Sequence, residues 1–401
     1  MVVVEIFLIS LALLGTTALW VKVFNHRHSC KLPCWGMRTI SVVCYLLILL
    51  LPMALAVWYW QAEQRLTNLI SQPQLSIPFF YIAVSWVVGG WVVATFWPRH
   101  PIDAPGFLLS NHTKHVDVLT ELGERYDGPG WVTALARFPG NELLQLCLHE
   151  KQLAIPRLPK PLHGLSIAHL SDLHFTRKVG KAYFEEVMRR TNEMGADLIA
   201  ITGDLLDRRA CLDWIPDTFG RLRARYGIYF VLGNHDLLLN EDELRRRLTE
   251  VGLSDLGGRH VTISINGCKV LLAGNELPWF PPAADMSTAT PRGDDSQPLR
   301  IVLAHSPDQF VWARQHDADL MLAGHTHGGQ IRLPYIGAIV SPSRYGTRYA
   351  CGAFFEPPTV MHVSRGISGT VPVRHNCPPE LTKLVLVNPT GSAPLKSSDL
   401  G

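Results

Sequence analysis

Hydrophobic residues are arranged in two different ways along the chain. The first hundred residues contain three long apolar runs, at about 6–21, 40–60 and 77–97. The second and third runs reach the roughly 20 residues that a helix needs to cross a bilayer, and their terminal Trp and Tyr residues suit its interface. We therefore expect a transmembrane region with three helices over residues 1–97, of which the first is the shortest.

The first run also resembles a cleaved signal peptide in length and position. Its N-terminus has no basic residue, however, and no small-residue cleavage site is obvious. An uncleaved anchor is therefore the preferred interpretation. The loop after this run is basic and the next loop, 61–76, has one basic residue, so the positive-inside rule places the first loop and everything after Trp97 in the cytoplasm. The four basic residues of the first loop are Lys22, Arg27, Lys31 and Arg38. The sequence thus predicts a multi-pass protein of the cell membrane.

The rest of the chain is built from much shorter apolar runs. Residues 98–142 mix Pro, Gly, His and charge without periodicity, which indicates a linker or a small subdomain. Between 143 and 388, runs typical of buried strands alternate with helical patterns, which predicts an α/β fold with helices on both faces of a sheet. Within it, residues 279–298 are expected to form an exposed loop, and 389–401 a disordered tail.

One helical pattern and one hairpin stand out in this second part. Tyr183, Phe184, Val187, Met188 and Thr191 fall on one face of a helix. Apolar alternation on either side of Gly267 predicts a β-hairpin.

Five of the short apolar runs end in side chains that can bind a metal. Because open α/β sheets bind ligands beyond the carboxyl ends of their strands, we expect these side chains to meet. A mixture of carboxylate and imidazole suits Mn, Fe or Zn better than Ca or Mg. The residues that follow the five runs are Asp172 and His174, Asp204, Asn234 to Asp236, His305, and His325 with His327.

Composition excludes some classes of function. The net charge of +3 is mild and evenly spread, whereas a nucleic-acid-binding protein would show a clustered basic face. We therefore expect no nucleic-acid partner. The 8 cysteines are mostly isolated in a chain too long to need disulfides, which favours a reducing compartment.

Taken together, the five motifs resemble the calcineurin-like metallophosphoesterases in order and spacing, over about residues 143–387. Residues 328–334 and 364–366 also resemble the membrane-associated YkuE- and YaeI-type branch of this family. The resemblance implies a sandwich of mixed sheets flanked by helices, following the N-terminal transmembrane region. It further implies a hydrolase of phosphoric esters with two divalent metal ions, Mn, Fe or Zn.

The same resemblance implies roles for individual residues. Asp204 would bridge the two ions, and a hydroxide held between them would attack phosphorus in line. His235 would act on the phosphoryl or leaving oxygen as stabiliser or general acid, with Asp236 fixing its tautomer. The first ion would be bound by Asp172, His174, Asp204 and His327, and the second by Asp204, Asn234, His305 and His325.

Several arginines are candidates for binding the phosphate, because a guanidinium meets phosphate oxygens in a bidentate manner. Any one of them is more often a surface charge. The three that we select are Arg332, Arg208 and Arg365, and Arg332 is preferred because it closely follows His327.

The function predicted from the sequence is that of a membrane-anchored phosphodiesterase or pyrophosphatase. A tether of three apolar runs favours a lipid-linked substrate such as UDP-2,3-diacylglucosamine, the intermediate of lipid A synthesis that one member of this branch cleaves. An aromatic loop, Trp279 to Pro282, would dip into the headgroup layer. The alternatives are a phosphodiesterase or phosphatase for soluble substrates, and a membrane scaffold that has lost its chemistry.

Overall fold

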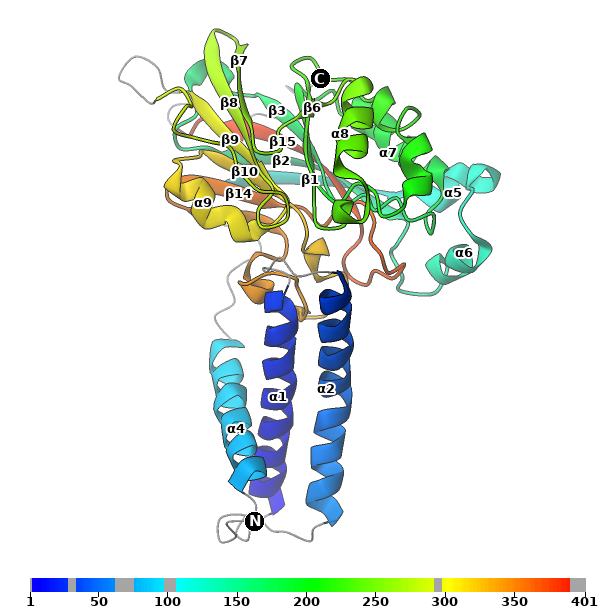
Figure 1. The fold of residues 1–401 in the computed structure, drawn as a ribbon, viewed down its shortest axis with the longest axis vertical. Helices are drawn as coiled ribbons and strands as arrows, with labels where there is room; N and C mark the ends of the chain where they lie inside the picture. The colour runs from blue at the N-terminus through cyan, green and yellow to red at the C-terminus, as the bar shows by residue number, and fades with distance from the viewer. Residues whose placement is uncertain (1, 28–33, 62–75, 97–105, 292–297, 390–401) are drawn as a thin grey trace. The chain divides into compact units, whose positions relative to one another are not determined.

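The structure is a computed structural model that describes residues 2–27, 34–61, 76–96, 106–291 and 298–389. The chain divides into two compact units (Figure 1). The helical unit comprises Met1–His100 and Pro342–Arg348. The sheet unit comprises Pro101–Ser341 and Tyr349–Gly401. The expected tail at 389–401 lies almost wholly outside the described residues.

Three long helices form the helical unit: α1 (Val2–His26), α2 (Cys34–Gln61) and α4 (Ser76–Phe96). Helices α1 and α4 approach closely at Gly15, where an added Cβ would lie 1.7 Å from the carbonyl oxygen of Ser85. Beside this contact, the hydroxyls of Thr16 and Ser85 are 3.0 Å apart and buried. Small residues and hydroxyl pairs at a helix crossing are typical of helices packed in a bilayer.

Length and apolar composition support one of the three expected membrane spans. Among the described residues, the segment Ile6–His26 is long and apolar enough to cross a membrane. The apolar stretches Thr39–Ala54 and Phe80–Ala94 are shorter. A multi-pass topology is therefore not supported by these two helices.

The sheet unit contains two mixed sheets, which confirms the predicted α/β class. In spatial order, the seven-stranded sheet consists of β1 (Leu108–Asp117), β2 (Gln145–Ala154), β15 (Glu380–Val387), β3 (Ser166–Leu170), β4 (Leu198–Thr202), β5 (Ile228–Val231) and β6 (Ser254–Asp255). The six-stranded sheet consists of β13 (Gly352–Glu356), β14 (Thr359–Val363), β10 (Leu320–Ala323), β9 (Leu299–Ala304), β8 (Cys268–Asn275) and β7 (His260–Ile265). A small ribbon of β11 (Arg332–Leu333) and β12 (Gly337–Ala338) follows the loop after β10.

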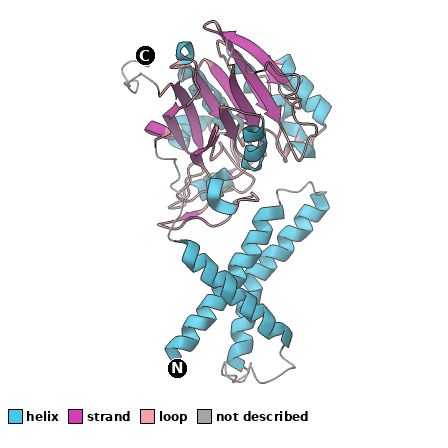
Figure 2. Cartoon of the chain, turned by 90° about the vertical axis from the view of Figure 1, so that its left-hand side faces the viewer, coloured by secondary structure: helices cyan, strands magenta, loops and turns pink. Residues whose placement is uncertain are grey.

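Helices cover the outer sides of the strands (Figure 2). The helices of this unit are α5 (Val118–Leu122), α6 (Gly130–Ala136), α7 (Lys181–Glu193), α8 (Glu241–Glu250) and α9 (Phe310–Gln315). The five residues predicted to share one helical face are all buried in α7, and β7 with β8 forms the predicted hairpin, so both predictions are confirmed. Apolar residues of both sheets, such as Ile167 and Leu322, form one buried cluster that joins the sheets.

Strand directions decide where the ends of the strands meet. Strands β3, β4 and β5 are parallel neighbours in one sheet, and β9 and β10 are parallel neighbours in the other. Each parallel set therefore brings its carboxyl ends to one edge, where the polar loops begin.

Two parts of the sheet unit differ from the expectation. Part of the segment expected to be a linker or small subdomain forms β1, which pairs antiparallel with β2 at the edge of the seven-stranded sheet. The loop expected to be exposed begins with Trp279 and Phe280, which are only 5 % and 6 % exposed. Aromatic rings in this loop therefore pack into the protein, and the prediction that they dip into a membrane is wrong.

Candidate metal centre

The carboxyl ends of five strands supply the polar side chains of the candidate metal centre. Strand β3 leads into Asp172 and His174, and β4 into Asp204. Strand β5 leads into Asn234 and His235. The other sheet supplies His305 directly after β9, and His325 with His327 after β10. Most of these side chains are buried, so the protein shields them from solvent.

Five of these residues have left-handed backbone conformations. The φ angles are 53° at Asp172, 47° at His174, 54° at Asp204, 70° at His325 and 49° at His327. Positive φ costs free energy in residues other than glycine, and such strain is concentrated at functional sites. These turns therefore place the side chains in the centre although the left-handed backbone conformation is unfavourable for Asp and His.

Close packing of the loops also explains a glycine. A Cβ on Gly324 would lie 1.8 Å from the hydroxyl oxygen of Ser171 and 2.4 Å from a carboxylate oxygen of Asp172. Only a residue without a side chain can let the β10 loop approach the β3 loop this closely.

The first group of candidate ligands contains Asp172, His174, Asp204 and His327, whose ligand atoms lie within 4.8 Å of one another. His174 Nε2 is 3.4 Å from Asp204 Oδ2 and 3.2 Å from His327 Nε2. His327 Nε2 is in turn 3.4 Å from Asp172 Oδ1.

The second group contains Asp204, His305 and His325, with Asn234 beside them. His305 Nε2 is 3.2 Å from Asp204 Oδ2 and 3.2 Å from Asn234 Oδ1. His325 Nδ1 is 3.2 Å from His305 Nε2. Asp204 thus belongs to both groups, and the same oxygen, Oδ2, faces His174 and His305.

These separations fit donor atoms that share an ion. Two donors each about 2.1 Å from one ion, at an angle between about 90° and 109°, lie roughly 3.0–3.4 Å apart. The distances of 3.2 and 3.4 Å between these atoms fall in this range, whereas the 3.9 Å between His174 Nε2 and Asp172 Oδ1 is longer. The donor set also mixes imidazole with carboxylate, as Mn, Fe and Zn prefer.

Hydrogen bonds on the far side of two imidazoles leave the nitrogen that faces the centre available to bind a metal. His305 Nδ1 donates to the Thr202 carbonyl at 2.7 Å, and His327 Nδ1 donates to the Ser368 carbonyl at 3.2 Å. Because a carbonyl only accepts, Nδ1 carries a proton in both rings, and Nε2 is the nitrogen that faces the centre and can bind a metal. A partner of this kind commonly orients metal-binding histidines.

The electrostatics of the centre favour a cation. Burial disfavours charge on Asp204, yet the His305 and His235 rings outweigh it and lower the pKa of Asp204 well below its usual range. Burial likewise opposes a charge on His305, but Asp204 raises its pKa to about 9. The carboxylate therefore attracts positive charge, which a bound metal ion would supply while displacing the proton of the ring.

His235 lies at the edge of the first group, with 30 % of its side chain exposed. Its Nδ1 is 2.5 Å from Asp207 Oδ1, and His174 Nδ1 is 2.9 Å from Asp207 Oδ2. Asp207 therefore orients two rings at once, one from each oxygen. Sequence reasoning missed Asp207, although a carboxylate three residues after a candidate ligand in Asp204-Leu-Leu-Asp207 was a usable signal.

Asp236 does not fix the tautomer of His235, and this part of the prediction is wrong. Its carboxylate instead accepts the backbone N–H groups of Gly233 at 2.8 Å, Leu205 at 3.0 Å and Leu206 at 3.1 Å. Burial and the nearby Asp204 raise its pKa to about 7. Asp236 therefore ties the β5 loop to the β4 loop.

The arginines differ in their availability to a substrate. Arg365 donates from Nε to Glu380 Oε2 at 2.8 Å, and the ion pair is largely buried. Arg332 donates to the Gly328 carbonyl at 2.9 Å, which keeps it beside the loop that carries His327. Arg208, directly after Asp207, is exposed. Arg365 is thus committed to Glu380, whereas Arg208 faces solvent.

A chain of buried polar groups lies behind the centre and joins the two sheets. Lys151 Nζ donates to His362 Nε2 at 3.2 Å, because a lysine has no acceptor. Because Nε2 of His362 accepts this bond, its Nδ1 carries the proton and donates to His169 Nδ1 at 2.9 Å. His169 Nε2 in turn donates to Thr202 Oγ1 at 2.8 Å. Burial lowers the pKa of His169 to about 4, so the ring is neutral as this order requires. The carbonyl of Thr202 also accepts the hydrogen bond from His305, so this chain of hydrogen bonds helps to position a candidate metal ligand.

Trp279 lines the centre on the side of the second group. Its ring centroid lies 5.0 Å from that of His325 and 5.4 Å from that of His305. The indole therefore packs against both imidazoles and limits the access of water to them.

Two sheets whose strand ends gather carboxylates and imidazoles around a shared aspartate define a metal-dependent hydrolase. A family model described as calcineurin-like phosphoesterase matches residues 165–329. The chain is 30 % identical over 243 residues to the metallophosphoesterase YkuE of Bacillus subtilis, covering 57 % of this chain and 81 % of YkuE. It is 30 % identical over 226 residues to the phosphodiesterase YaeI of Escherichia coli, covering 55 % and 82 %.

A third relative is the UDP-2,3-diacylglucosamine pyrophosphatase LpxG of Chlamydia muridarum. The chain is 25 % identical to it over 286 residues, covering 56 % of this chain and 85 % of LpxG. The protein belongs to the calcineurin-like phosphoesterase family. It is a metal-dependent hydrolase of phosphoric esters.

Replacement of Asp207 tests its role. In Asp207→Asn the amide offers one acceptor oxygen, so it can no longer accept from both His174 and His235. We expect kcat to fall about 10- to 100-fold, as for other residues that orient metal ligands. The matched control is Asp213→Asn, because the side chain of Asp213 is 84 % exposed. Steady-state kinetics of both variants decide the matter, and full activity in Asp207→Asn would remove Asp207 from the site.

Proposed function

We propose that the protein is a membrane-anchored phosphodiesterase or pyrophosphatase with two metal ions. The observation that carries the proposal is the position of Asp204 in both ligand groups, with one oxygen facing His174 and His305. The first ion would be held by Asp172, His174, Asp204 and His327, and the second by Asp204, Asn234, His305 and His325.

When bound, two such ions activate water near neutral pH and neutralise the charge of a phosphoryl group. The protein's own residues then position the substrate and handle the leaving group. His235 is the candidate for this task, because it lies beside the first group, is partly exposed and is oriented by Asp207. From there it can donate a hydrogen bond or a proton to the leaving oxygen.

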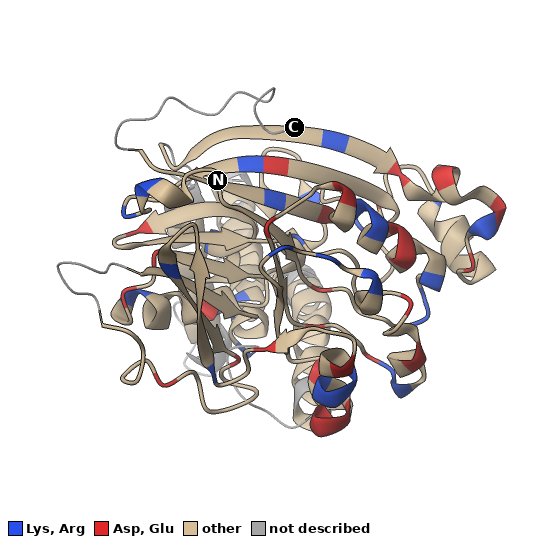
Figure 3. Ribbon diagram, turned by 90° about the horizontal axis from the view of Figure 1, so that it is seen from above, with Lys and Arg blue, Asp and Glu red and all other residues tan. Residues whose placement is uncertain are grey.

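Anchoring through α1 rests on the apolar segment Ile6–His26. The basic residues that follow it along the chain favour a cytoplasmic position for the sheet unit. In the view of Figure 3, Lys and Arg residues (blue) and Asp and Glu residues (red) are interspersed over strands and helices.

A lipid-linked substrate is the finer part of the proposal. It is supported by the membrane anchor and by similarity to LpxG, which acts on UDP-2,3-diacylglucosamine. The aromatic loop no longer supports a lipid-linked substrate, because Trp279 is buried. The alternative is a phosphodiesterase for soluble substrates, and the description of YaeI as a phosphodiesterase fits either kind of substrate.

The first test of the proposal separates metal binding from catalysis. Asp204→Asn should lose much of the affinity for both ions, because both groups lose a shared carboxylate. His235→Ala should keep its metal content and lose turnover by about 10²- to 10⁴-fold. Elemental analysis and kinetics of the purified variants beside wild type provide the measurement. Metal loss in His235→Ala together with metal retention in Asp204→Asn would refute the assignment.

The second test concerns the side of the membrane. A fluorescent protein fused after Gly401 should be fluorescent in a bacterial host, and alkaline phosphatase fused at the same point should be inactive. The same result follows from one membrane span or three, so it tests the orientation alone. Active alkaline phosphatase would place the sheet unit outside the cytoplasm and revive the signal-peptide interpretation.

The third test concerns the acyl chains of the substrate. We expect kcat/KM in detergent with added Mn to be at least about tenfold higher for an acylated substrate than for the same compound without acyl chains. The matched pairs are UDP-2,3-diacylglucosamine with UDP-glucosamine, and a glycerophospholipid with its deacylated phosphodiester. Equal values within both pairs would exclude the lipid hypothesis and leave the soluble phosphodiesterase.

A further inference from the structure

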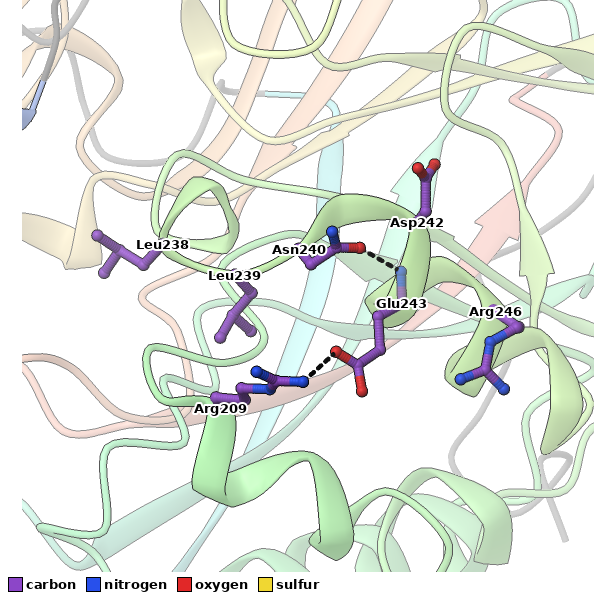
Figure 4. Close-up of a pocket in the computed structure, with 7 residues that line it drawn as sticks. All are labelled: Arg209, Leu238, Leu239, Asn240, Asp242, Glu243 and Arg246. Atoms are coloured by element: carbon purple, nitrogen blue, oxygen red, sulfur yellow. Dashed lines mark hydrogen bonds and ion pairs between the residues drawn. The ribbon is translucent and has the colours of Figure 1, made fainter.

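A surface cavity of about 650 Å³ is lined by residues that follow Asp207 and His235 closely along the chain (Figure 4). Arg209, on one wall, comes two residues after Asp207. Leu238, on the other wall, follows His235 in a tight turn closed by the bond from Leu238 N to His235 O at 3.0 Å. Since consecutive Cα atoms are about 3.8 Å apart, the Cα atom of Arg209 lies within about 8 Å of the Cα atom of Asp207.

Charges in this cavity are balanced. Arg209 forms an ion pair with Glu243 at 3.4 Å, as Figure 4 shows. Arg246, which also lines the cavity, pairs with Glu250 at 2.5 Å. Asp242 adds a further carboxylate. The cavity therefore has no excess of positive charge with which to attract a second phosphate.

Apolar surface is the other property of the cavity. Leu238 is 48 % exposed and Leu239 lies beside it on the same wall. Leu237, the preceding residue, is also 38 % exposed. Leucine side chains exposed beside a polar centre gain free energy when an apolar group covers them. The volume is within the range of about 300–1,000 Å³ that is common for small-molecule sites.

From these observations we infer that the cavity binds the uncharged organic group attached to the leaving oxygen of a phosphodiester. The inference rests on the proposed function, in which His235 faces that oxygen. The group on the oxygen then extends past His235 towards Leu238. A pyrophosphate would place a second charged phosphate there, so a diester with a ring-sized leaving group is the favoured substrate class.

Three substrates test this assignment, all methyl aryl phosphates whose leaving phenols have similar pKa values. One carries a phenyl group, one a naphthyl group and one a sulfonated naphthyl group. Wild type should show about tenfold higher kcat/KM for the naphthyl than for the phenyl compound, because the second ring covers the leucines. The sulfonate, being charged, should abolish that advantage.

Leu238→Ala should bring the ratio of naphthyl to phenyl kcat/KM close to one. Val311→Ala is the matched control, because Val311 is an exposed apolar residue, 41 % exposed, on α9 outside the cavity. It should leave the ratio as in wild type. A melting temperature for each variant verifies that it is folded.

The outcomes separate the two levels of the proposal. If wild type hydrolyses the diesters but the ratio is unchanged in Leu238→Ala, the cavity assignment is overturned and the proposed function stands. If the sulfonated compound is the best of the three, the cavity is an anion site and the assignment is again overturned. If metal-loaded wild type hydrolyses none of the diesters but hydrolyses a UDP-sugar substrate, the cavity assignment is overturned and the proposed function stands. Hydrolysis of neither class would count against the proposed function itself.

Discussion

The burial of carboxylates at a single point is the constraint on which the rest of this structure depends. Asp172 and Asp204 are 0 % and 1 % exposed, and Asp207 accepts hydrogen bonds from two imidazoles beside them. An ionised carboxylate inside a protein is costly unless it is paired or bound to a metal. The imidazoles around these groups compensate part of the charge, and cations can compensate the remainder. The turns that carry the ligands have a left-handed backbone that no local preference favours. These favourable interactions between the carboxylates, the imidazoles and a bound cation therefore have to offset the strain of the turns.

The two sheets must keep a fixed relation for the centre to exist, because each supplies only part of the ligands. Apolar packing alone lets sheets slide more easily than a directional contact does. The chain from Lys151 through His362 and His169 to Thr202 crosses between the sheets and has a defined order of donors. Buried polar networks that are fully satisfied make a core more specific. Here that specificity fixes Thr202, whose carbonyl sets the orientation of His305.

How much of the structure could be predicted from the sequence depended on the range of the interactions. Strand ends were readable because an apolar run followed by Asp or His is a local signal. Strand β1 was not, since its polar, mostly exposed residues carry no apolar periodicity. A local sequence pattern also could not show whether Asp207 or Asp236 is the hydrogen-bond partner of His235. Asp236 is the neighbour in sequence, but the turn directs its carboxylate to backbone N–H groups, and a separate loop brings Asp207 to the ring.

The interactions that the arginines make within the protein affect how phosphate can be recognised. Arg365 is bound to Glu380, and Arg374 is fully buried and donates to the carbonyls of Arg365 and Cys377. Neither guanidinium is available to a substrate. The carboxylates of the centre would by themselves repel a phosphoryl group. Ions held by these carboxylates would reverse that repulsion, so we expect the binding of metal and of phosphate to be linked, with Arg208 as a candidate arginine that faces solvent. In our proposal, the rest of the substrate determines specificity and binds other surfaces, such as the cavity that Leu238 and Leu239 help to line.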